Sequence, residues 1–125
     1  MLPKLIPGVL LALALAMQAP GDWPVFRGNP TQTGVADSKL PDKLEVLWKF
    51  EVKGAIEGTA CIAHGMVYVG CQDEHVYAIK LSDGKPQWKY KAGAPIKVGT
   101  AYNAGLVYAG DEDGKFHCID AKTGE

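Results

Sequence analysis

One stretch occurs twice in this chain, first at 65–84 and again at 105–124. The first copy starts at residue 65 and the second at residue 105, and we call this offset in residue number one repeat. The matched pairs include Val67 and Val107, Tyr68 and Tyr108, Gly70 and Gly110, Asp73 and Asp113, Ile79 and Ile119, and Gly84 and Gly124. A repeat of this length indicates a chain built from similar supersecondary units that stack on one another.

Each copy alternates apolar and polar residues with a period of two, which is typical of short antiparallel strands. Strands are expected at 57–63, 66–71, 75–80 and 87–91, and again at 97–102, 106–110 and 115–119. Turns are expected at His64-Gly65 and at Asp113-Gly114, where Asp-Gly favours a two-residue hairpin. Four short strands in about 40 residues predict one blade of a β-propeller. The expected fold class is therefore all-β, with one full blade and most of a second.

The segment 44–52 has the same period of two, because Leu44, Val46, Trp48, Phe50 and Val52 alternate with polar residues. Ring propellers hold roughly four to eight blades, more than these residues encode. We therefore expect this segment to be a strand that completes a blade formed elsewhere, and the chain to be the N-terminal part of a longer protein. The repeat places the next tryptophan at position 128. Unpaired sheet edges predict aggregation when the 125 residues are expressed alone.

The segment 1–16 has the features of an export signal. Lys4 gives a positive start, and an apolar run leads to Ala14-Leu15-Ala16, which has the form of a cleavage site. The rival interpretation is a membrane anchor, but 5–19 is shorter than the roughly 20 apolar residues that a spanning helix needs. We expect a signal peptide at 1–16, an irregular lead-in at 17–43 and propeller repeats at 44–125, with no membrane span after cleavage.

Charge and cysteine content exclude some classes of function. The formal net charge is −1 and both signs are scattered along the chain, whereas a nucleic-acid-binding protein needs a clustered basic face. The three cysteines, Cys61, Cys71 and Cys118, match no zinc pattern and occupy no common repeat position. We interpret them as buried small side chains in preference to a disulfide pair.

The repeat resembles that of the PQQ-like, or quinoprotein-type, β-propellers. The similarity lies in the segments 65–70, 76–79 and 83–88, and the lead-in at 22–30 is similar to that of exported bacterial members. The segment 78–88 resembles the tryptophan-docking motif of this family, although Lys80 and Asp83 depart from it. The resemblance implies that the tryptophan stacks on a peptide plane of the neighbouring blade. The structural docking residues are then Trp48, Trp88, Ala78, Gly84 and Gly124.

Groups that carry chemistry are not recognisable in the sequence. His64, His75 and His117 share no repeat position, so a metal cluster is not expected. The acidic residues at 111–113 resemble the start of a calcium loop but lack its final glutamate. A quinoprotein dehydrogenase would bring a catalytic Asp, calcium-binding Glu and Asn, and adjacent cysteines. We therefore predict no catalytic, cofactor-binding or metal-binding residue in this chain.

Three functions are compatible with these observations. The first is an exported scaffold or protein-binding propeller, located in the periplasm or cell envelope, that acts on protein partners. The second is the N-terminal part of a quinoprotein oxidoreductase whose catalytic residues lie beyond residue 125, and only this alternative involves PQQ and calcium. The third is a carbohydrate- or polymer-binding module.

Overall fold

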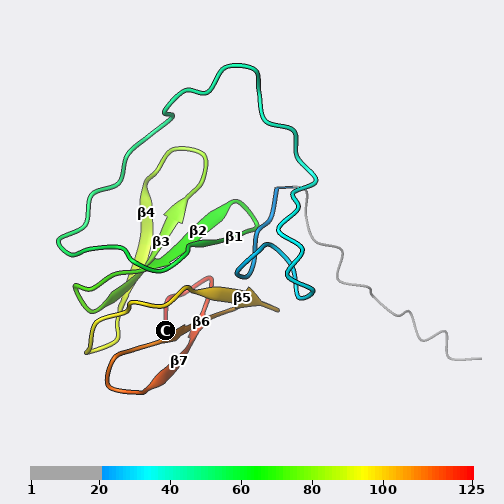
Figure 1. Ribbon diagram of the computed structural model, residues 1–125. Coiled ribbons are helices and arrows are strands. Elements are labelled where there is room, and N and C mark those ends of the chain that lie inside the picture. The colour runs from blue at the N-terminus through cyan, green and yellow to red at the C-terminus, as the bar shows by residue number, and fades with distance from the viewer. Residues whose placement is uncertain (1–20) are drawn as a thin grey trace, which may run out of the picture.

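A computed structural model describes residues 21–125 as two antiparallel sheets, one packed on the other (Figure 1). The predicted signal peptide at 1–16 lies outside the described residues. The first sheet has the order β1-β2-β3-β4 and consists of β1 (Cys61–Ala63), β2 (Met66–Gly70), β3 (His75–Lys80) and β4 (Pro86–Lys91). The second has the order β5-β6-β7 and consists of β5 (Ala101–Asn103), β6 (Leu106–Gly110) and β7 (Phe116–Asp120). These are the expected full blade and three strands of a second blade.

The strands match the sequence prediction except at the start of each sheet. β1 and β5 begin at Cys61 and Ala101, later than the expected starts at 57 and 97. The preceding residues bond across the two sheets instead of extending the ladders, since the Thr100 amide donates to the Thr59 carbonyl at 3.1 Å. Contact between the blades therefore competes with strand pairing for these backbone groups.

One of the two predicted hairpin turns is wrong. At the β1–β2 turn, His64 and Gly65 both have positive φ, of 50° and 73°, as a two-residue turn requires. The β6–β7 loop instead spans 111–115, and of Asp113 and Gly114 only the glycine has positive φ. This loop is closed by Asp111, whose backbone amide donates to the Lys115 carbonyl at 3.0 Å and whose side chain accepts the Lys115 amide at 2.8 Å.

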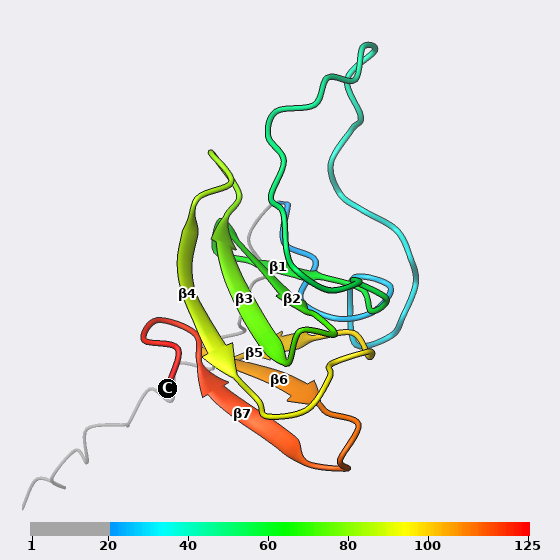
Figure 2. The same cartoon turned by 90° about the vertical axis from the view of Figure 1, so that its left-hand side faces the viewer.

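No strand is formed at 44–52, and the expectation that this segment completes a blade formed elsewhere stays a prediction, because the described residues contain no such blade. The segment belongs to a long loop that projects from the sheets (Figure 2) and returns to the first sheet at Trp48 and Phe50. Its apolar residues alternate as in a strand, but the segment pairs with no strand of either sheet. A strand forms only where a neighbouring backbone accepts and donates hydrogen bonds, and sequence periodicity does not supply that neighbour.

The lead-in is tied to the first strand of both sheets. Trp23 forms an isolated antiparallel bridge with Ile62 of β1, with hydrogen bonds of 2.7 and 2.9 Å. The next residue, Pro24, accepts a hydrogen bond of 2.7 Å from the Tyr102 amide of β5. An irregular segment thereby satisfies backbone groups on β1 and β5 and holds the two sheets side by side.

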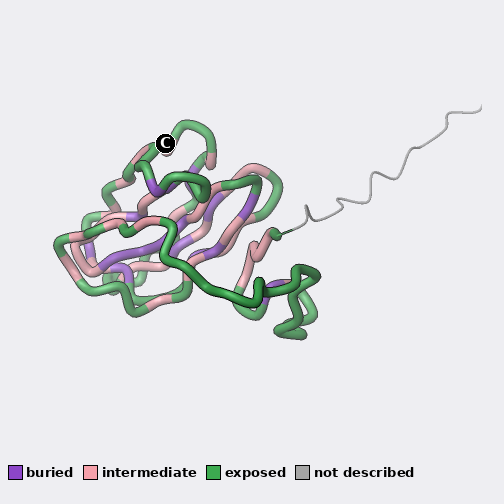
Figure 3. Tube along the Cα trace, turned by 90° about the horizontal axis from the view of Figure 1, so that it is seen from above, coloured by how far each residue is buried: buried purple, intermediate pink, exposed green. Residues whose placement is uncertain are grey.

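The core lies between the sheets and draws on both of them. Figure 3 shows the buried residues gathered in the strands and the exposed ones along the long loop. The cluster comprises Cys61, Ala63, Tyr68, Val76, Ala78, Ile96, Val107, Ala109 and Ile119. Because β2, β3, β6 and β7 all contribute, each sheet depends on the other to bury its apolar face.

Candidate functional site

The two docking tryptophans make the same contacts one repeat apart. Trp88 of β4 donates a hydrogen bond of 2.9 Å from its indole nitrogen to the Ala121 carbonyl, and its ring covers Gly124 so closely that an added Cβ would lie 2.8 Å from it. Trp48 donates at 2.8 Å to the Leu81 carbonyl, and its ring covers Gly84 with a corresponding distance of 2.7 Å. Both glycines have positive φ, 70° at Gly84 and 79° at Gly124.

The fifth predicted docking residue, Ala78, lies behind Trp88 in the first sheet. It is buried on β3 directly opposite Trp88 of β4 in the antiparallel register. A small side chain at this position leaves room for the indole ring against the core. The structure therefore places Ala78, Trp88 and Gly124 together at one contact, and Trp48 and Gly84 together at a second.

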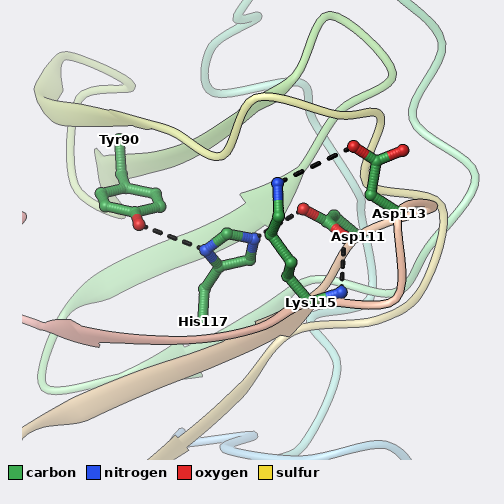
Figure 4. Close-up of polar contacts among 5 residues, drawn as sticks. All are labelled: Tyr90, Asp111, Asp113, Lys115 and His117. Atoms are coloured by element: carbon green, nitrogen blue, oxygen red, sulfur yellow. Dashed lines mark hydrogen bonds and ion pairs between the residues drawn. The ribbon is translucent and has the colours of Figure 1, made fainter.

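A polar chain of three side chains lies between the two sheets (Figure 4). The Asp111 carboxylate lies 2.9 Å from Nε2 of His117, and Nδ1 of the same imidazole lies 3.2 Å from the hydroxyl of Tyr90. A carboxylate only accepts, so Nε2 donates to Asp111, and in the tautomer whose Nδ1 carries no proton the Tyr90 hydroxyl donates to Nδ1. Tyr90 belongs to β4 and His117 to β7, so this chain joins the outer strand of one sheet to the next sheet.

A related contact is formed by the residues that lie one repeat before Tyr90 and His117. Phe50 packs edge-on against Tyr77 of β3 at 5.5 Å between ring centroids, and Tyr77 donates a hydrogen bond of 2.6 Å to Asp73. One repeat relates Phe50 to Tyr90, and Tyr77 to His117. The carboxylate comes from a different position in each loop, because Asp73 corresponds to Asp113 and not to Asp111.

The carboxylates of both contacts are held in the charged form. The hydrogen bond from His117, together with the Lys115 backbone amide, keeps the pKa of Asp111 below its usual value. Burial by itself raises the pKa of Asp73, but the hydrogen bonds from Tyr77 and Cys71 and the nearby His75 outweigh it and lower that pKa. Burial and the bond to Asp73 raise the pKa of Tyr77 to about 12. These shifts favour the charged carboxylate of Asp73 and of Asp111, and the neutral hydroxyl of Tyr77.

These lowered pKa values predict acid sensitivity. A carboxylate whose pKa is lower in the folded state stabilises the fold above the ordinary aspartate pKa of about 4, and this stabilisation is lost as the pH falls through the lowered value. We expect the free energy of unfolding to decline below about pH 4, and less steeply in Asp111→Asn. Urea unfolding between pH 2 and 7 measures this. An identical decline in the parent and the variant would contradict the role of Asp111.

The cysteines do not pair with one another, and they differ in exposure. Cys61 and Cys71 are buried as expected, but Cys118 is exposed on β7, so the prediction of burial is wrong for this residue. The reason is that Cys118 lies on the last strand of its sheet, where none of the described residues forms a fourth strand to cover it. Burial raises the pKa of the Cys61 thiol to about 11, which makes it less reactive.

We expect thiol reagents to distinguish the three cysteines. In dilute native protein Cys118 should react rapidly, while Cys61 and Cys71 react only after unfolding. Titration with a chromophoric disulfide reagent, before and after addition of denaturant, measures the fraction of each class. The variant Cys118→Ser removes the fast class and serves as the control. Fast reaction of more than one thiol in the native state would contradict this prediction.

Two cavities lie beside the lead-in and away from the polar contacts. One, of about 500 Å³, is formed by the lead-in against Ile62, and the other, of about 380 Å³, by the lead-in against the start of β5. Neither Asp73, Tyr90, Asp111 nor His117 lines them. Within 21–125 no group of three or more His, Cys, Asp and Glu residues is placed to hold a metal ion. The described part of the chain also contains no helix capable of crossing a membrane.

Sequence reasoning missed the Asp111–His117 pair. It found no repeat position shared by His117 and another histidine and placed Asp111 at the start of a possible calcium loop, but it did not bring the two together. The available signal was a comparison of the two copies, in which the second replaces a tyrosine by the shorter histidine and a cysteine by Asp111. Only the structure shows that these two differences compensate for each other.

Comparisons with known proteins agree on the repeat. A family model described as outer membrane protein assembly factor BamB matches residues 42–125. The dehydrogenase subunit of the quinone alcohol dehydrogenase of Gluconobacter oxydans is 27% identical, over 85% of this chain and 16% of its own length. The quinoprotein ethanol dehydrogenase of Pseudomonas aeruginosa is 34% identical, over 65% of this chain and 14% of its own. The chain thus spans less than a fifth of these relatives.

Solved structures give the same picture of the fold. The quinohemoprotein alcohol dehydrogenase from Comamonas testosteroni superposes with a TM-score of 0.73 and 25% identity, over 90% of this chain and 19% of that protein. BamB from Moraxella catarrhalis superposes with a TM-score of 0.60 over 65% of this chain and 25% of that protein, at 14% identity, and supports the fold alone. The predicted fold class, all-β propeller blades, is confirmed.

Proposed function

Because the chain belongs to the PQQ-like repeat family described as outer membrane protein assembly factor BamB, we propose that it is an exported β-propeller module that binds protein partners in the cell envelope. Export rests on the signal-like sequence of 1–16. The docking contacts of the two tryptophans and the buried polar chain act as framework in this proposal. Trp88 and the Tyr90–His117 contact join the first sheet to the second, Trp48 ties the preceding loop to the first sheet, and none of these residues lines either cavity.

The observation that carries the proposal is the long loop at 35–60, which precedes the first sheet. It projects from the sheets in Figures 1 and 2 and exposes large aliphatic side chains between 35 and 47. They are Val35, Leu40, Leu44, Val46 and Leu47, and Leu40 is 82% exposed. An exposed group of apolar side chains of this kind marks an interaction site on a soluble protein.

The charges of this loop favour a protein surface over a lipid surface. Between 37 and 45 the loop carries three acidic and two basic residues, interspersed with the aliphatic ones. An anionic membrane surface attracts an excess of basic residues, which this segment lacks. Apolar side chains with a mixed polar surround are typical of a contact with a protein groove.

A photo-crosslinking experiment in cells tests this function. A photoreactive phenylalanine at Leu40 should give one discrete adduct with an envelope protein, and the same probe at Leu81, on the turn after β3, should not. The partner is identified by mass spectrometry and the complex is reconstituted from purified proteins. We expect Leu40→Asp to weaken it at least tenfold, about 1.4 kcal/mol. The proposal fails if the adduct contains only further copies of this chain, or if Leu40→Asp leaves the affinity unchanged.

A second candidate is the N-terminal part of a quinoprotein oxidoreductase. The lead-in favours it, because the model described as BamB begins at residue 42, whereas the match to the Gluconobacter dehydrogenase subunit covers 85% of this chain. The described residues, however, do not fit a quinone and calcium site. They include no set of three acidic, histidine or cysteine residues arranged for a metal, and no two of the described cysteines are adjacent in sequence. We therefore assign no step of an oxidation to residues 21–125.

Cofactor binding separates the two candidates. The purified full chain is dialysed against PQQ in the presence and absence of calcium, and the retained quinone is measured by absorbance. Our proposal expects no saturable retention. Saturable, calcium-dependent retention together with dye-linked oxidation of an alcohol would replace the binding function by the oxidoreductase function.

A further inference from the structure

The larger of the two cavities, of about 500 Å³, is formed almost entirely by the lead-in. All but one of the described residues that line it lie between 21 and 38, and the exception is Ile62 of β1. Figure 1 shows this part of the lead-in folded back on itself beside β1. Small-ligand sites in proteins have volumes of roughly 300–1,000 Å³, so the cavity has the size of a binding site. Its walls are set by one continuous segment and by the strand to which that segment is bonded.

Hydrogen bonds within the lead-in hold one wall of the cavity. The Gly34 amide donates to the Arg27 carbonyl at 2.9 Å and closes the loop between them. Inside this loop the Asn29 side chain donates to the Thr33 hydroxyl at 2.6 Å and accepts from the Thr33 amide at 3.2 Å. Asn29 and Thr33 both line the cavity, and their polar groups are engaged with each other. This wall is therefore formed before a ligand binds, which lowers the entropic cost of binding.

Trp23 supplies an aromatic wall. Its backbone is fixed by the two hydrogen bonds to Ile62, and its ring lies so close to Gly28 that an added Cβ would be 2.7 Å from the ring. The residue is only partly buried, and it lines the cavity. The face of an indole ring attracts cations more strongly than that of any other aromatic side chain. A cationic group that enters the cavity therefore has an aromatic partner there.

The ionisable groups of the cavity carry one sign. Asp22 and Asp37 line it, and no lysine, arginine or histidine is among its described lining residues. The Asp22 carboxylate accepts the His64 backbone amide at 3.0 Å, which fixes its position, and Asp37 is exposed. Arg27, the only basic residue between 21 and 38, lies against Gly34, where its Nε is 3.6 Å from the position of an added Cβ. The cavity therefore favours a positively charged ligand, whereas the described lining of the smaller cavity contains no ionisable residue.

We propose that this cavity binds a lysine or arginine side chain of the protein partner, between the ring of Trp23 and the carboxylates of Asp22 and Asp37. This role rests on the proposed function, to which it adds the chemical group that the partner presents. Val35 connects the two, because it lines the cavity and also belongs to the exposed aliphatic group of the loop. A partner that covers these aliphatic side chains therefore lies next to the cavity. Charge attraction is stronger there than on an open surface, since a cavity partly excludes water.

Titration of the purified chain with single blocked amino acids tests the cavity without the partner. Nα-acetyl-lysine methylamide and Nα-acetyl-arginine methylamide should bind saturably, with a Kd of about 1 mM, and shift the indole N–H resonance of Trp23 in the NMR spectrum. The matched neutral probes are the norleucine and citrulline derivatives, which have nearly the same shape and no charge. They should bind about tenfold more weakly. No saturable binding by the charged probes, or equal binding by the neutral ones, would overturn the proposal.

Variants at the cavity assign the binding to these side chains. Asp37→Asn should weaken binding of both charged probes about fivefold, because one of the two carboxylates is lost. Asp42→Asn removes the same charge from a residue that does not line the cavity, and it should change the Kd by less than about twofold. Trp23→Leu should also weaken binding, while the backbone bonds to Ile62 do not require the ring. Unchanged binding in both Asp37→Asn and Trp23→Leu would overturn the site.

The partner complex decides whether the natural ligand is a protein side chain. In the complex identified by crosslinking at Leu40, Asp37→Asn should lower the affinity about fivefold, Asp42→Asn should not, and the charged probes should compete with the partner. An unchanged affinity in Asp37→Asn, with probe binding intact in the parent, would assign the cavity to a free cation and overturn the partner side chain. If no adduct forms at Leu40, the proposed function fails and the partner side chain with it, whereas the probe titration still confirms or refutes the cation site.

Discussion

Replacing Trp88 with alanine is expected to lower the free energy of unfolding by about 3 kcal/mol, the lower end of the range for large aromatic residues because the ring is only partly buried. The ring covers Gly124, packs against Tyr68 with 5.8 Å between centroids, and bonds the Ala121 carbonyl. Its loss removes a principal contact between the two sheets. Urea unfolding followed by circular dichroism measures the change, which is a large fraction of the stability of a small domain.

The matched control for this prediction is Trp88→Phe. Phenylalanine keeps most of the ring over Gly124 but cannot donate to the Ala121 carbonyl, so we expect a loss of about 1 kcal/mol. The difference between the two variants then separates packing from hydrogen bonding. If alanine and phenylalanine cost the same small amount, the tryptophan does not hold the sheets together and the proposed docking role is wrong.

Replacing Gly70 with alanine is expected to cost about 2–3 kcal/mol, although only one methyl group is added. An ideal Cβ at this position would overlap the side chain of Ile96, whose own Cβ would lie 2.8 Å away. Ile96 is fully buried between the sheets, and buried side chains are close-packed, so we expect little relief of this overlap. The backbone φ of Gly70 is not in the left-handed region, so the expected effect is steric and not conformational.

Two further variants make the test at Gly70 specific. Ile96→Ala removes the atoms that overlap, so the combined variant should cost less than the sum of the two single changes. Gly110→Ala, at the matching position one repeat later, should change the stability of the dilute chain by well under about 1 kcal/mol, because its nearest neighbour is at 3.6 Å. Equal losses at Gly70 and Gly110 would show that the contact with Ile96 is not the cause.

The strand positions were largely predictable from the sequence, and the contacts between sheets were not. Alternation of apolar residues located β2 and β3 to within one residue. The same alternation gives no strand at 44–52 among the described residues, because pairing needs a second backbone that lies beyond the segment itself. Burial of all three cysteines failed at Cys118 for the same reason, since an edge strand has no neighbour to cover it.

The sequence by itself determined the unit of construction. Strand periodicity, turn glycines such as Gly65, and the spacing of the two copies can all be read along the chain, and they are sufficient to predict four-stranded blades. Only the tertiary structure decided that Asp111 meets His117 while Asp73 meets Tyr77. That choice depends on which position of the loop before β7 or β3 brings its carboxylate within reach of the ring, a distance that the sequence pattern does not encode.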